Sequence, residues 1–118
     1  MEKLTDGLIL FCKKECATCT MIVPVIKELS KGDKSLTIFT QDDPGFPEGI
    51  PGVVNDTLLE HSYHFQIETV PTLISLENGQ EIRRTVGWDR EEWRTITGIK
   101  GLGEGLPPFR PGCGSKNV

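Results

Sequence analysis

The chain has 118 residues, of which 36% are hydrophobic and 25% are charged, and its formal net charge at pH 7 is −4. This length suits one domain with a modest core. The charge balance offers no basic stripe to neutralise phosphates, so we expect no nucleic-acid partner. Residues 1–11 hold no apolar run long enough for a secretory signal or a membrane span. We therefore expect a cytoplasmic protein with no membrane partner.

The predicted elements begin with a strand, a helix and a second strand. Leu8–Cys12 is apolar throughout, which is typical of a strand buried on both faces of a parallel sheet. Apolar residues recur at helical spacing over residues 16–30, and Pro24 predicts a kink there because proline cannot donate to the preceding turn. Ser35–Thr40 is the second strand. A strand–helix–strand crossover is right-handed, so we expect these two strands to be parallel.

A long connection and a second helix follow. Gln41–Asn55 contains three prolines and three glycines without periodicity, and connections of this length in compact domains are often functional. We expect a helix over residues 57–65. Either Asp56 or Thr57 can cap it, and Thr57 with Glu60 would form a capping box.

A hairpin and a last helix complete the predicted domain. The dipeptide Asn78-Gly79 lies between two strand-like runs, which is a strong hairpin signal. Residues 72–76 and 80–86 are therefore expected to be antiparallel partners. Asp89 is expected to cap the last helix, and Gly98 to end it.

The composition changes after this helix. Gly98–Val118 holds six glycines and three prolines, which is typical of a tail or linker rather than of packed structure. We therefore divide the chain into a domain over residues 1–98 and a Gly/Pro-rich tail or linker over residues 99–118. Cys113 presents a thiol in this segment. It could reach back to Cys16, bridge two chains or stay unengaged.

The most informative motif is Cys16-x-x-Cys19, where the first strand gives way to the first helix. In a chain without a secretory signal this arrangement indicates a redox motif. A helix start offers unpaired N–H groups and a partial positive charge that stabilise a thiolate, and only the thiolate attacks a disulfide. We predict that Cys16 is the nucleophile and Cys19 the resolving thiol. Residues 41–55 should lie beside them, because parallel strands end at the same edge of a sheet.

Two longer stretches carry a resemblance to a known family. CATCTMIVPVIKEL (residues 16–29) resembles the active-site helix of the thioredoxin superfamily, and TVPTLISLENGQEIRRTVG (residues 69–87) resembles its cis-proline strand, hairpin and following glycine. The resemblance covers roughly residues 7–97 and implies a thioredoxin-like α/β fold. It implies the minimal form, with helices flanking a four-stranded mixed sheet in the order β-α-β-α-β-β-α.

The same resemblance implies a substrate-binding groove. The Val70–Pro71 bond should be cis, and Pro71 should face the Cys16–Cys19 pair. In this family the backbone just before the proline pairs with an extended substrate peptide, a short form of strand addition. Gly87 should line the same groove.

The chain departs from the family pattern near the motif. Ala17-Thr18 replaces Gly-Pro between the cysteines, and Glu15 replaces a tryptophan before the first of them. Leu10 stands in the place of a buried acid, and Cys12 in the place of a tryptophan beneath the site. Glu15 should oppose the thiolate of Cys16, whereas Lys13 and Lys14 could favour it, so the direction of any shift in the pKa of Cys16 stays open.

Metal-binding alternatives are weaker. Cys12, Cys16 and Cys19 have a spacing that iron–sulfur enzymes use, but Cys12 belongs to a strand. A zinc site would need Cys16 and Cys19 together with His61 or His64, and histidines three apart on a helix more often form a solvated edge. We therefore expect no metal and no cofactor.

The leading functional prediction is a thiol–disulfide oxidoreductase that exchanges disulfides through Cys16 and Cys19. Its partners would be a protein or small-molecule disulfide substrate and an unidentified electron donor. The alternative is a thioredoxin-fold docking module, possibly redox-regulated, within a larger assembly.

Overall fold

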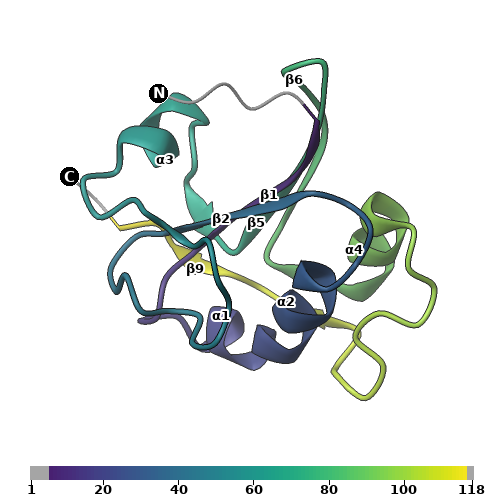
Figure 1. Ribbon diagram of the computed structural model, residues 1–118. Helices are drawn as coiled ribbons and strands as arrows, with labels where there is room; N and C mark the ends of the chain where they lie inside the picture. Colours follow the sequence, from purple (N-terminus) through teal and green to yellow (C-terminus); the bar gives the residue numbers. More distant parts are fainter. Residues whose placement is uncertain (1–5, 117–118) are drawn as a thin grey trace.

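The computed structural model describes residues 6–116, which form a mixed sheet with helices on both faces (Figure 1). The strand order is β3-β2-β1-β5-β6, with β1 parallel to β2 and antiparallel to β5. Within the described residues, no helix has the length and apolar character needed to cross a membrane. The strands of the sheet are β1 (Gly7–Cys12), β2 (Leu36–Thr40), β3 (Val54–Asn55), β5 (Thr72–Glu77) and β6 (Gln80–Val86).

The α/β class and the mixed sheet confirm the prediction, but the expectation of four strands is wrong. The short strand β3 adds a fifth, because Val54 and Asn55 pair in parallel with Phe39 and Thr40 of β2. Two residues carry no periodicity that would mark a strand in the sequence. Only the unpaired edge of β2 gives them a partner for their backbone groups.

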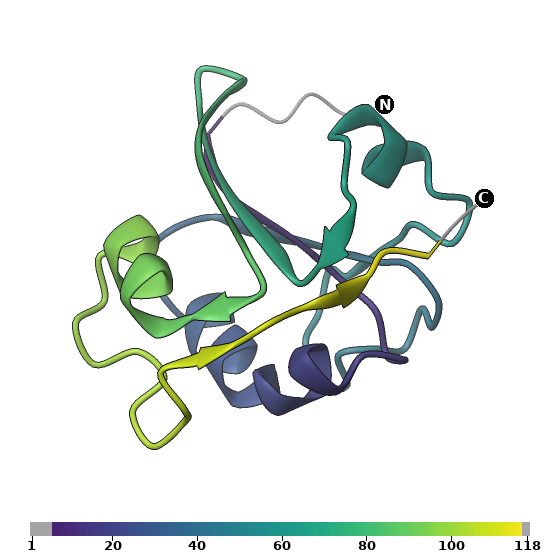
Figure 2. The same ribbon diagram turned by 180° about the vertical axis from the view of Figure 1, so that it is seen from behind.

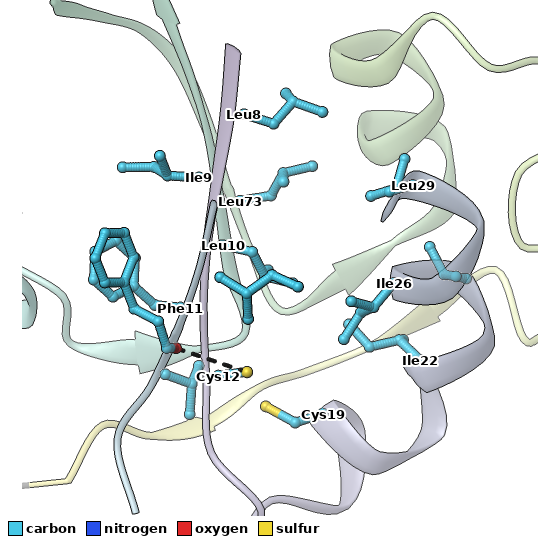
Figure 3. Close-up of a cluster of buried hydrophobic side chains, with 14 of the residues drawn as sticks. Leu8, Ile9, Leu10, Phe11, Cys12, Cys19, Ile22, Ile26, Leu29 and Leu73 are labelled. Carbon is cyan, nitrogen blue, oxygen red and sulfur yellow. Dashed lines mark hydrogen bonds between the residues drawn. The ribbon is translucent and has the colours of Figure 1, made fainter. Parts of the chain in front are cut away.

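The core lies on both faces of β1, as its unbroken apolar run predicts. Figure 3 shows Leu8, Leu10 and Cys12 pointing toward the helix that follows Cys19. Ile9 and Phe11 point to the opposite face, where the Phe11 ring stacks on Phe39 with centroids 4.8 Å apart. All of these side chains are buried, so β1 joins two apolar layers.

The first predicted helix is present but broken in two. It divides into α1 (Ala17–Met21) and α2 (Val23–Ser30), with Ile22 between them. Pro24 lies in the first turn of α2, where its missing N–H costs no helical hydrogen bond. The predicted kink is therefore a change from one helix to the next.

The second predicted helix is shorter than expected. It is α3 (Glu60–His64), and its start is held by Asp56 rather than by a capping box. The buried Asp56 carboxylate accepts hydrogen bonds from the N–H groups of His61 and Ser62 and from the Ser62 hydroxyl, at 2.9, 3.0 and 2.6 Å. Leu59 has a positive φ of 63° immediately before the helix, which displaces the start from the expected Thr57.

The last helix, α4 (Arg90–Thr97), begins and ends as predicted. The Asp89 side chain accepts from the N–H of Glu92 at 3.2 Å, and Gly98 ends the helix with a φ of 75°. Trp88 and Trp93 are fully buried, with ring centroids 5.2 Å apart.

Residues 99–116 differ from the expected loose tail, because they pack against the domain. Leu102 is 0% exposed, and the indole N–H of Trp88 donates to Pro107 O at 2.7 Å. Two short strands, β8 (Phe109–Arg110) and β9 (Cys113–Gly114), pair antiparallel with β7 (Trp88–Asp89) and β4 (Thr69–Val70). Figure 2 shows this segment crossing the molecule in front of α2. The division of the chain at residue 98 stays a prediction.

Candidate active site

Cys16 lies between the end of β1 and the start of α1. It is the N-cap residue of α1, and its Sγ accepts a hydrogen bond from the N–H of Cys19 at 3.2 Å. The loop before it is held by Asp42, whose carboxylate accepts from the N–H groups of Lys14 and Glu15 at 2.7 and 2.9 Å. The predicted proximity of residues 41–55 to Cys16 is therefore confirmed.

The surroundings of Cys16 favour its thiolate. Hydrogen bonding from the Cys19 thiol is the largest cause that lowers the pKa of Cys16, followed by the Cys113 thiol and the backbone N–H groups of Cys19 and Thr18. Burial acts in the opposite direction, but the pKa falls to about 5. The balance that the sequence left open is thus decided by hydrogen-bond donors. With this lowered pKa, Cys16 is mostly a thiolate near neutral pH, which is the form of a cysteine that attacks a disulfide.

Cys19 is the protonated partner. It is fully buried, and this burial, together with the neighbouring Cys16, raises the pKa of its thiol. Its sulfur and that of Cys12 point toward one another beneath the site (Figure 3). The Cys12 thiol donates to Phe39 O at 3.7 Å, and burial raises its pKa as well. Cys12 is thus a buried, protonated side chain of the core.

The structure brings Val70, Pro71 and Gly87 to the same place as Cys16. The Val70–Pro71 bond is cis, and Cys16 Sγ lies 3.6 Å from Val70 O, to which it donates when it is protonated. The N–H of Gly87 donates to Pro71 O at 2.7 Å. These three residues and Cys16 therefore line one edge of the domain, where β4 presents its backbone.

Two residues that the sequence reasoning did not select also lie here. The Thr18 hydroxyl donates to Pro111 O at 2.7 Å, and Gly112 lies against the backbone of Val70. In the sequence, Thr18 is recognisable only as part of a departure from the family pattern. Its role depends on a segment more than ninety residues away, which no local signal reveals.

The zinc alternative is not supported. Within residues 6–116 the structure gathers no group of three or more His, Cys, Asp and Glu side chains suited to a metal ion. His61 instead packs on Phe39, with ring centroids 4.6 Å apart. All four cysteines, each in the described part of the chain, are free thiols.

The known proteins to which this chain is similar in sequence are thioredoxins. No model of a known protein family matches the chain. It is 27% identical to a thioredoxin H-type of Fagopyrum esculentum over 82 residues, which are 70% of this chain and 60% of that protein. It is 26% identical to a thioredoxin of Chlamydia trachomatis over 88 residues, which are 73% of this chain and 74% of that protein.

A solved structure gives the same result for the fold. The reduced thioredoxin pre-protein of Schistosoma mansoni superposes with a TM-score of 0.58 at 25% identity, over 80% of this chain and 79% of that one.

Proposed function

Because the chain is a thioredoxin-like superfamily protein, we propose that it is a thiol–disulfide oxidoreductase that exchanges disulfides through Cys16 and Cys19. The observation that carries this proposal is the contrast between the two thiols. Hydrogen bonds lower the pKa of Cys16 to about 5, and burial raises the pKa of Cys19 one helical turn away. Cys16 is thus the thiolate that attacks the substrate disulfide, and Cys19 is the protonated thiol that resolves the mixed disulfide in the second step.

The reaction has two exchange steps. The Cys16 thiolate attacks one sulfur of a disulfide, the substrate S–S bond breaks, and the first substrate thiolate leaves and takes a proton from solvent. Cys19 then loses its proton and attacks Cys16 Sγ, which releases the second substrate thiolate to accept a proton. The substrate disulfide is reduced to two thiols, and the Cys16–Cys19 pair is oxidised to a disulfide.

The partners follow from this chemistry. The substrate is a protein or small-molecule disulfide, and an electron donor must return the Cys16–Cys19 disulfide to its dithiol form. The backbone of Val70 beside cis-Pro71, together with Gly87, forms the groove for an extended peptide next to the substrate sulfur. We assign this activity to the cytoplasm, where disulfides are kept reduced.

The test is insulin reduction with dithiothreitol as the donor. The native protein should accelerate the reaction over dithiothreitol alone, and Cys16→Ser should not, because it lacks the attacking thiolate. Gly112→Ala should be at least as fast as the native protein, because a Cβ on Gly112 would lie 2.5 Å from Val70 O and should favour the lifting of residues 109–116 from the groove. If neither the native protein nor Gly112→Ala exceeds Cys16→Ser, the protein is a docking module rather than an oxidoreductase.

A further inference from the structure

The groove beside the cis-proline is filled by the protein's own chain. β9 pairs antiparallel with β4, so that Cys113 lies opposite Val70 and Gly114 opposite Thr69. The N–H of Ser115 continues the pairing by donating to Glu68 O at 2.9 Å. In both Figure 1 and Figure 2 the yellow strand lies along the teal one. This arrangement is strand addition to the edge next to Pro71.

Hydrogen bonds from side chains on both sides of Cys113 hold residues 109–116 in place. The Thr18 hydroxyl holds Pro111 O from the cysteine motif at 2.7 Å. At the other end, the buried Gln41 amide donates to the Ser115 hydroxyl at 2.7 Å and accepts from the N–H of Lys116 at 2.9 Å. Contacts therefore flank Cys113 in both directions along the chain.

Two glycines permit this close approach. A Cβ on Gly112 would lie 2.5 Å from Val70 O and 2.6 Å from Thr69 Cγ2, and a Cβ on Gly87 would lie 2.9 Å from the N of Gly112. Contacts below 3.0 Å are not tolerated without movement. The groove and the segment thus fit each other at backbone distance.

The position of residues 109–116 in the groove brings a third thiol, that of Cys113, close to Cys16. Cys113 lies opposite Val70, whose carbonyl oxygen is 3.6 Å from Cys16 Sγ. At this position the Cys113 thiol helps to lower the pKa of Cys16, and burial together with the neighbouring Cys16 raises the pKa of Cys113. Cys16 is only 4% exposed. An external disulfide therefore needs this segment to lift before it can reach Cys16, and on return the segment would bring its thiol back beside the same sulfur.

We propose that residues 109–116 are an internal substrate strand and that Cys113 is a third exchanging thiol, which forms a reversible disulfide with Cys16. This inference rests on the proposed function, since it uses the Cys16 nucleophile. The external oxidant is the substrate disulfide itself.

The step balances as follows. After Cys16 has attacked an external disulfide and released one thiolate, Cys113 loses its proton and attacks Cys16 Sγ. The mixed disulfide breaks, the second external thiolate leaves and takes a proton, and a Cys16–Cys113 disulfide forms. Cys19 then attacks Cys16 Sγ, which returns Cys113 to its thiol form and leaves the Cys16–Cys19 disulfide.

The test uses Cys19→Ser, in which Cys19 no longer resolves the intermediate. The reduced variant is mixed with micromolar cystamine, quenched with acid, and analysed by intact mass and by mapping of linked peptides. A thiol held beside its target has an effective concentration on the order of millimolar. The internal Cys16–Cys113 disulfide should therefore exceed the cysteamine adduct of Cys16 by at least about 100-fold. The matched control, Cys19→Ser with Cys113→Ser, should retain cysteamine on Cys16.

The outcomes separate this inference from the proposed function. A stable cysteamine adduct on Cys16 beside a free Cys113 in the single variant would overturn the inference and support Cys16 as nucleophile. Cys16 that never reacts in either variant would overturn both. If Cys19→Ser does not fold, Cys19→Ala provides the same measurement.

Discussion

Replacing Gly112 by alanine should open the groove next to Cys16. Gly112 has no positive φ, so alanine brings no backbone strain, and its effect is steric. The new Cβ would lie 2.5 Å from Val70 O, an atom that cannot move far because it belongs to the backbone beside Pro71. The clash is relieved when the segment lifts.

The expected size follows from the cost of overpacking. Adding a methyl group to a closely packed site costs about 1–3 kcal/mol. Since every 1.4 kcal/mol is a factor of ten in an equilibrium constant, the population with the segment lifted should rise about 5- to 140-fold. Cys16 is covered in the seated form, so its rate of modification should rise in the same proportion when closing is fast.

The assay is alkylation of the reduced protein with limiting iodoacetamide at neutral pH, followed by mass spectrometry of the peptide that contains Cys16. Gly114→Ala is the matched control, because within residues 6–116 a Cβ on Gly114 meets no atom within 4 Å. It makes the same chemical change two positions away and should leave the rate unchanged. Equal rates in the native protein and both variants would refute the claim that the segment covers Cys16.

Three further predictions concern the site and the fold. Alkylation of Cys16 should precede that of Cys19 and rise with pH to half its maximum near pH 5. This pKa is lowered from 9.0 on folding. The reduced protein should therefore gain stability relative to the oxidised protein as pH rises from 5 to 9, and it should lose that gain as pH falls through 5. Thermal unfolding of the two forms over this pH range measures the difference, and identical profiles would contradict the prediction. Asp56→Ala should lower the free energy of unfolding in urea by about 2–4 kcal/mol, because three hydrogen bonds to a buried carboxylate are lost. Thr57→Ala is its control at about 0.5 kcal/mol or less, and equal losses in the two variants would show that Asp56 does not hold α3.

The sequence by itself determined the parts of this protein that depend on neighbouring residues. The apolar run of β1, the hairpin at Asn78-Gly79 and the Asp89 cap of α4 are local signals, and the structure contains all three. The Cys16-x-x-Cys19 motif belongs to the same group, because its position at a strand–helix junction follows from periodicity alone.

Tertiary structure decided the features whose partners lie far away along the chain. β3 exists only because β2 offers it an edge. A short segment without periodicity has no preferred structure until another part of the molecule satisfies its backbone groups.

Residues 99–116 show this most clearly. Their glycines and prolines indicate a loose linker when they are considered alone. In the folded protein the Trp88 indole donates a hydrogen bond to Pro107 O, Cys113 pairs with β4, and Leu102 is buried in the core. The missing side chain of Gly112, which weakens any local structural preference, is what allows the segment to lie against Val70. The pKa of Cys16 likewise combines donors from its own motif, Cys19 and Thr18, with the distant Cys113, because a pKa responds to neighbours in space.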